Sequence, residues 1–322
     1  MEARAIQTAL RGALHAPSAH NAQPWRLIDR GGDEFVLRYA FADRLLADPD
    51  DRDGMMAMGG FYETLSLSAA HVGLRTRFEP IMATHANGID VGVVYFAQRE
   101  EPESELASSV ARRQCNRNAY SPLPLPAALC RALEDLGNLL LRPSRIAGLV
   151  ALASVMAWKD RRFVSDLRQW TRFDDHSPDG MTVDCLRLSA IDQLALKAAL
   201  RLGSLPAGMA RVYAQRDVRL THASGAMAVL TTESREPLAL FDCGRRLIRS
   251  WTLINHLGYS WHPMSIVIDQ ATVGELSEMI DGHDPVAIYR VGYTASPAAW
   301  SKRRDLSAVL VAQADHQPLD TM

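Results

Sequence analysis

The sequence predicts a globular protein in which helices and strands alternate, of the α/β or α+β class. Its 322 residues are 48% hydrophobic and 22% charged, the composition of a chain that buries a sizeable core. Stretches with helical spacing of apolar residues alternate with short apolar runs bounded by turn residues. These observations favour a mixed fold over an all-helical or all-strand one.

Composition also bears on the class of partner and on the compartment. The net charge of −2 gives no electrostatic case for nucleic acid or an anionic membrane, and no apolar run is long enough to span a bilayer. The four cysteines are scattered without a C-x-x-C pair, which favours a reducing compartment over zinc or a disulfide framework. The charged N-terminal helix is no secretory signal, so we expect a cytoplasmic protein.

The first hundred residues predict helix, hairpin, helix, hairpin. A helix over 3–15 ends before Pro17, and strands at 25–28 and 35–39 join across two glycines. A helix follows over 53–71, and then come strands around Phe78 and over 91–96. The charged run from Gln98 to Glu105 is the candidate linker. We therefore expect an N-terminal half over 1–100 and a C-terminal half over 101–322.

The second half is richer in helix. Its expected strands are 226–232 and 286–291, and the segment 171–184 breaks the helical pattern with turn residues. The expected helices are 127–140, 145–169, 189–202, 238–257 and 273–280.

The loop after the first helix carries the most specific pattern. Residues Pro17 to Trp25 read P-S-x-x-N-x-Q-P-W, a proline-stiffened loop with short hydrogen-bonding side chains at Ser18 and Asn21. Such residues also end helices and start turns in proteins without any ligand. The six fixed positions favour a binding loop over that simpler interpretation.

Three further segments add to this loop. Arg113-x-Cys115-x-Arg117 offers the kind of guanidinium donors that a phosphate needs, although two arginines four residues apart are more often only solvated. The segment 258–265 is either a binding loop or a capping glycine before a core strand. The basic cluster 301–304 is either a phosphate contact or a solvated terminus.

Together and in this order, the four segments resemble the FMN-dependent nitroreductase family, and within it the Acg-type single-chain branch. The resemblance runs from Ala5 to about Leu306. It implies an α+β, nitroreductase-like fold with antiparallel-rich sheets and packed helices. It also implies two fused halves that mimic the family homodimer. The second half has no other P-S-x-x-N-x-Q-P-W loop, so we expect one FMN per chain, in a monomer that acts as an internal pseudo-dimer or in a homodimer.

The resemblance also implies the residues of the flavin site. Cys115 departs from the family, because it stands where a hydroxyl residue is expected and a thiol is a poor hydrogen-bond donor. The implied ring contacts are Pro17, Ser18, Ala19 and Asn21; the implied phosphate contacts are Arg113, Cys115, Arg117, Lys302 and Arg303; and the implied contacts at the redox-active edge are Pro263, Met264 and Ser265.

The implied activity is hydride transfer from NADPH or NADH through FMN to a small nitroaromatic or quinone-type acceptor. FMN would carry the chemistry, so no catalytic side chain and no metal is expected. The alternative is a protein that stores, sequesters or senses FMN under a lid formed by the insert 170–185. A third hypothesis is a scaffold that has lost FMN, suggested by Cys115 alone.

Other site classes find no support. The histidines share no metal-ligand spacing, and no G-x-S-x-G, G-x-G-x-x-G or P-loop motif is present. The acidic run from Asp48 to Asp51 predicts a helix-start cap better than a catalytic carboxylate pair.

Overall fold

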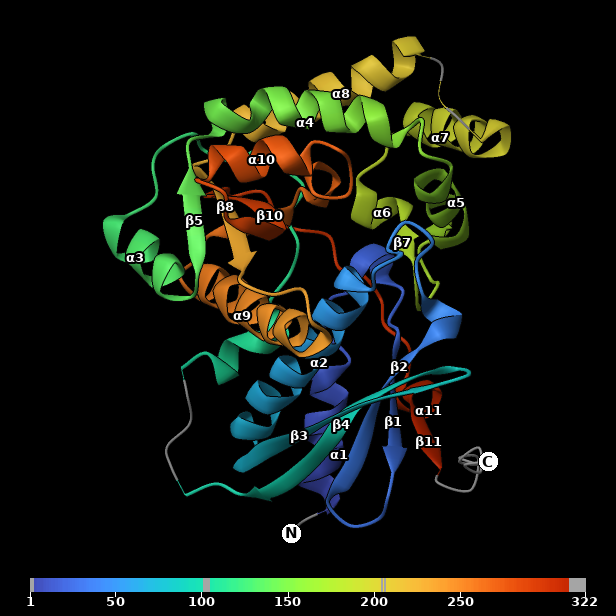
Figure 1. Cartoon of the computed structure of the whole chain (residues 1–322), viewed down its shortest axis with the longest axis vertical. Coiled ribbons are helices and arrows are strands. Elements are labelled where there is room, and N and C mark those ends of the chain that lie inside the picture. Colours follow the sequence, from blue (N-terminus) through green and yellow to red (C-terminus); the bar gives the residue numbers. More distant parts are fainter. Residues whose placement is uncertain (1–2, 101–104, 204, 206, 313–322) are drawn as a thin grey trace.

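Two long helices, α2 (Arg52–His71) and α9 (Pro237–His256), pack against each other near the middle of the molecule, with one sheet on each side (Figure 1). The structure is a computed structural model and describes residues 3–100, 105–203, 205 and 207–312. Pro237 occupies the first turn of α9, where its missing N–H costs no hydrogen bond.

The first sheet has the order β11-β1-β2-β4-β3. Its strands are β1 (Trp25–Asp29), β2 (Glu34–Ala40), β3 (Leu74–His85), β4 (Gly88–Gln98) and β11 (Leu310–Ala312). The first four strands pair antiparallel, whereas β11 comes from the C-terminal end and pairs parallel with β1. Alternate side chains of β1 and β2, such as Trp25 and Leu37, are buried with helix α1 (Ala3–Ala13) and α2 in one core.

The second sheet has the order β5-β8-β10-β9 and is antiparallel throughout. Its strands are β5 (Asn138–Leu141), β8 (Ala226–Thr232), β9 (Ser260–Pro263) and β10 (Asp284–Gly292). Residues of α9 and of α3 (Ala127–Asp135) are buried against one face. Residues of α4 (Pro143–Ala157) and α10 (Val273–Met279) are buried with the other.

Apart from β11, the two sheets share one connectivity. Each runs strand, strand, long helix, strand, strand, with the fourth strand between the second and the third. The contact between α2 and α9 is also symmetrical, because a glycine of each helix lies against a backbone carbonyl of the other. A Cβ added at Gly59 would lie 1.8 Å from the Phe241 carbonyl oxygen, and one added at Gly244 would lie 2.0 Å from that of Met56. In both cases the carbonyl belongs to the residue three positions before the partner helix's glycine.

A helical segment separates β5 from β8. After α4 come α5 (Arg161–Trp170), the short parallel pair β6 (Thr171–Arg172) and β7 (Met181–Thr182), then α6 (Val183–Leu186), α7 (Ala190–Leu202) and α8 (Ala207–His222). The remaining elements are short: η1 (Ala19–Asn21), η2 (Phe41–Asp43), η3 (Ala107–Arg112), η4 (Ser265–Val267) and α11 (Leu306–Val309).

The expected elements are largely confirmed, with three corrections. The expected helix 145–169 is two helices, because Asp160 caps α5 by accepting the N–H of Arg162 at 2.8 Å. The expected helix 127–140 ends at Asp135, because Gly137 adopts a left-handed φ of 82° and β5 follows. Helix α8 was not predicted.

Two further expectations concern the linker between the two expected halves and the absence of a membrane-spanning segment. The candidate linker begins where β4 ends, but its residues 101–104 lie outside the described residues. No helix within the described ranges combines the length and the apolar character that crossing a membrane requires.

The α2–α9 contact yields a stability prediction. Gly59→Ala and Gly244→Ala should each lower the free energy of unfolding by about 1–3 kcal/mol, because the new methyl group overlaps a backbone carbonyl that cannot swing away. Urea unfolding measures the effect. Gly148→Ala in α4 is the matched control, since nothing lies within 4 Å of its Cβ position, and it should be neutral or stabilising. Equal behaviour of all three variants would contradict the close contact.

Candidate functional site

A cavity of about 380 Å³ lies where the loop after α1, the two long helices, β9, η4 and the inserted segment meet. This volume is in the range of small-molecule and cofactor sites. Its walls are mostly apolar, with Met56, Ile248 and Met264 among the contributors. Chain segments from both ends of the sequence are needed to close it.

Ten of the twelve site residues expected from the sequence line this cavity. They are Pro17, Ser18, Ala19, Asn21, Cys115, Arg117, Pro263, Met264, Ser265 and Arg303. Arg113 and Lys302 do not line it. The Arg113 guanidinium lies 4.0 Å from the ring centroid of Trp251, and the Lys302 side chain is exposed.

The loop after α1 has a strained backbone. His20, Asn21 and Gln23 adopt positive φ values of 52°, 56° and 55°. Such conformations are costly for residues other than glycine and persist where the surrounding structure enforces them, often at functional sites. Here the Gln23 N–H donates to Ser18 Oγ at 2.9 Å, which holds the turn.

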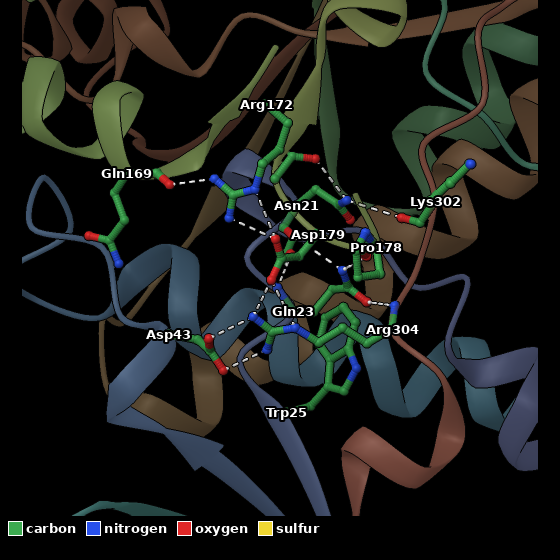
Figure 2. Close-up of polar contacts among 12 residues, drawn as sticks. Asn21, Gln23, Trp25, Asp43, Gln169, Arg172, Pro178, Asp179, Lys302 and Arg304 are labelled. Atoms are coloured by element: carbon green, nitrogen blue, oxygen red, sulfur yellow. Dashed lines mark hydrogen bonds and ion pairs between the residues drawn. The ribbon is translucent and has the colours of Figure 1, made fainter. Parts of the chain in front are cut away.

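The same loop binds two distant segments, as Figure 2 shows. Asn21 Nδ2 donates to the Gly180 carbonyl (2.9 Å) and to the Lys302 carbonyl (3.1 Å). Gln23 Nε2 donates to the Pro178 carbonyl, and Gln23 Oε1 accepts the Arg304 N–H, each at 2.9 Å. The Asn21 amide nitrogen thus bonds to two distant segments, whereas its Oδ1 is buried and has no hydrogen-bond partner in the described part of the chain.

Three arginines gather at one end of the site. Arg113 donates to the His15 carbonyl, Arg303 Nε to the Ala16 carbonyl (3.2 Å), and Arg117 Nη1 to the Cys185 carbonyl (3.0 Å). Within the described part of the chain, none of the three forms an ion pair with a carboxylate.

The electrostatic consequence is visible in the arginine pKa values. Burial lowers the pKa of Arg113 to about 9, and the neighbouring Arg303 contributes. Burial likewise lowers the pKa of Arg303 to about 10. Buried positive charge without a partner is costly, so this end of the cavity would be stabilised by an anion.

Cys115 lines the cavity beside these arginines. Burial raises the pKa of its thiol, so the residue contributes a neutral S–H rather than a thiolate. All four cysteines of the chain are free. The segment Arg113-x-Cys115-x-Arg117 therefore presents a neutral thiol, and no hydroxyl, to the cavity at position 115.

The inserted segment lines part of the cavity and is held there by hydrogen bonds and ion pairs. Phe163, Met181 and Cys185 are among the lining residues. Asp179 accepts from Arg172 Nη2 and from Arg304 Nη2, each at 2.7 Å, as Figure 2 shows. Arg304 also binds both oxygens of Asp43, at 2.9 and 3.0 Å. We call the segment 170–185 the lid, and the bonds of Asp179 its clasp.

A charged group at the start of α2 was not predicted. Arg52 Nη2 binds Asp53 Oδ1 at 2.8 Å and Asp269 Oδ1 at 2.5 Å, and both aspartates line the cavity. No sequence pattern indicates that Arg52 and Asp269, which are far apart in the chain, form an ion pair. The interpretation of Asp48 as a helix-start cap is confirmed, because its carboxylate accepts the backbone N–H groups of Asp53 (3.2 Å) and Gly54 (2.9 Å).

Comparison with known proteins supplies similar sequences, whereas no family model matches the chain. NAD(P)H nitroreductase Rv3131 of Mycobacterium tuberculosis, a provisional name, is 27% identical over 181 residues, which are 53% of this chain and 52% of that protein. NAD(P)H nitroreductase PigM of a Serratia species is 25% identical over 304 residues, 84% of this chain and 82% of that protein. The chain spans about half the length of the mycobacterial relative.

A solved structure supports the fold. The crystal structure of a protein from Anabaena variabilis, provisionally described as a nitroreductase, has a TM-score of 0.51 at 10% identity and covers 89% of this chain and 87% of its own. At 10% identity, this similarity is evidence for the fold alone. The expected nitroreductase-like α+β fold with antiparallel-rich sheets is confirmed, and the chain is similar in sequence to proteins named nitroreductases.

Asp48 yields a pH prediction. Burial and the charge of Asp53 raise its pKa to about 7, so between about pH 4 and 7 the folded state holds a proton that the unfolded chain has released. Stability from this group is therefore lost as pH rises. Relative to Asp48→Asn, the wild type should lose unfolding free energy from pH 5 to 7, by at most about 1.4 kcal/mol per pH unit.

Urea unfolding at several pH values measures this difference. Asp50→Asn, which alters an exposed neighbour, should follow the wild-type pH dependence. A wild-type profile parallel to that of Asp48→Asn would show that the Asp48 pKa is not raised.

Proposed function

We propose that this protein binds one FMN in the described cavity and transfers hydride from NADPH or NADH to a small nitroaromatic or quinone-type acceptor. The observation that carries the proposal is a group of arginines, Arg113 buried and Arg117 and Arg303 half-buried, that have no carboxylate partner among the described residues and lie at one end of a largely apolar cavity. The relatives named NAD(P)H nitroreductases supply the reaction class.

The residues of the cavity suit FMN in three respects. A phosphate would receive guanidinium donors from Arg117 and Arg303, with the charge of Arg113 behind them. A flat ring system would find apolar walls. A donor on that ring could be met by the buried, unpartnered Asn21 Oδ1. FMN, when bound, supplies the hydride chemistry, and the protein supplies binding, orientation and exclusion of water.

We propose that two halves of the chain form this site as an internal pseudo-dimer. The strained loop with Ser18 and Asn21 belongs to the first half, and Arg117, Pro263 and Arg303 belong to the second. The shared strand order of the two sheets and the reciprocal contacts at Gly59 and Gly244 support a common origin of the halves. One binding loop and one arginine motif then imply one FMN per chain.

Storage or sequestration of FMN is the second candidate function, and the lid favours it. Met181 and Cys185 line the cavity, and Asp179 ties this segment to Arg304, while Arg172 of the lid itself binds the same carboxylate. A lid held in this position would restrict access of a hydride donor to a bound flavin. The two functions differ only in how readily the lid opens.

Two substitutions test the composite site. Arg117→Ala should weaken FMN binding by about 2 kcal/mol, roughly 30-fold, because a charge-assisted phosphate contact is lost. Asn21→Ala should weaken it as well, because its bonds to Gly180 and Lys302 hold the other side of the site. Quenching of flavin fluorescence measures both. Arg112→Ala, at an exposed arginine next to the motif, is the control and should bind normally. Wild-type affinity in both test variants would rule out the composite site.

A substitution in the clasp distinguishes a working reductase from a protein that stores FMN. Asp179→Asn removes the charge that Arg172 and Arg304 share, so the lid should open more readily. Anaerobic bleaching of bound flavin by NADPH or NADH should then be severalfold faster than in wild type. Asp175→Asn, at an exposed position of the same lid, is the control. Fast wild-type bleaching that the substitution leaves unchanged would show that the lid does not limit the reaction, and so would count against sequestration.

A further inference from the structure

Arg290 is a fully buried cation that the proposed function leaves unexplained. It lies in β10 with no exposed surface, and its guanidinium is 4.0 Å from the ring centroid of Tyr120. Among the residues that the structure describes, Nη1 has no hydrogen-bond partner, and Nη2 has one, the Asn116 carbonyl at 3.4 Å. Among the described residues no carboxylate forms an ion pair with it. A buried charge of this kind is expensive, which points to a specific use.

The shorter of the two side-chain hydrogen bonds given for Arg290 runs to a histidine of the cavity wall. Its Nε donates to Nδ1 of His262 at 3.0 Å. A guanidinium can only donate, so Nδ1 must present its lone pair, and the proton of the neutral imidazole must then sit on Nε2. Burial and the charge of Arg290 also lower the pKa of His262 well below its ordinary value. Arg290 thus fixes the tautomer of His262, and burial together with the charge of Arg290 favours the neutral imidazole.

His262 lies beside the phosphate motif. It belongs to β9 and lines the cavity. The motif segment runs parallel to β9, because Cys115 pairs with Trp261 and the Asn116 N–H donates to the Trp261 carbonyl at 2.9 Å. Arg117 lies close enough for its charge to contribute to the lowered pKa of His262.

We propose that His262 donates a hydrogen bond from Nε2–H to the phosphate of the bound flavin nucleotide, and that Arg290 is the residue that positions it. This inference rests on the proposed FMN site. It supplies the neutral donor that the motif lacks, since Cys115 stands where a hydroxyl is expected. A neutral donor set beside arginines adds directional binding without adding to the charge repulsion among them.

The charged surroundings of His262 fit this role. Besides Arg290 and Arg117, Arg216 of α8 also lowers the pKa of His262. Asp217 of the same helix lines the cavity, but its Oδ2 accepts from Ser154 Oγ at 2.7 Å. The groups that act on His262 are therefore cations, which oppose its protonation and favour an anion as its ligand.

Flavin binding tests the proposal. FMN and riboflavin differ by the phosphate alone, so their affinity ratio isolates phosphate contacts. His262→Phe should lower FMN affinity about tenfold and leave riboflavin affinity within about twofold. His262→Gln, whose amide nitrogen can take the place of Nε2, should recover part of the loss. If wild type binds FMN and the ratio is unchanged by His262→Phe, this inference fails alone. If wild type binds neither flavin, the proposed function fails together with it.

Nitrogen NMR of the wild-type imidazole tests the tautomer without a destabilising variant. The His262 resonances are assigned by their loss in His262→Gln. We expect a bare Nδ1 and a protonated Nε2, unchanged between about pH 5.5 and 8 where an ordinary histidine titrates. A proton on Nδ1, or an imidazolium within that range, would overturn the assignment of Arg290 as the positioning residue.

Discussion

The close approach of α2 and α9 is the constraint on which the site depends. Gly59 and Gly244 let each helix lie against a backbone carbonyl of the other, and larger side chains at these positions would push the helices apart. Met56 and Gly60 of α2 and Gly244 and Ile248 of α9 line the cavity, so its width is set by this contact. Glu63 strengthens the same interface, because its buried carboxylate binds Arg245 (3.1 Å) and Arg249 (2.6 Å) across the helix pair.

The charged side chains around the cavity determine which class of ligand it can bind. One end carries arginines, and burial lowers the pKa values of two of them, Arg113 and Arg303; the wall of the cavity also includes Asp53 and Asp269, which both bind Arg52. The arginines at the first end have no carboxylate counter-charge among the described residues, whereas the two aspartates have a counter-charge in Arg52. An anionic group is therefore the ligand that the first end selects, and an apolar, planar group suits the apolar walls of the cavity.

Local sequence patterns predicted the parts of the site that are local. The loop from Pro17 to Trp25 and the Arg113–Arg117 motif each lie within a few residues, and most of their members line the cavity. The clasp between Asp179 and Arg304 could not be predicted, because it joins side chains far apart in the chain. The hydrogen bond from Arg290 to His262 could not be predicted for the same reason. Helix α8 escaped prediction because charged residues such as Arg211, Arg216 and Arg219 interrupt its apolar pattern.

The most direct test of the composite site is its stoichiometry with FMN. The central claim is that two unequal halves of one chain form one cavity with a single arginine-lined end. Calorimetric titration of the full chain with FMN should give one site per chain, whether the protein is monomeric or dimeric. Two sites per chain, or half a site, would contradict the account, because each would require a different arrangement of binding loops and arginines.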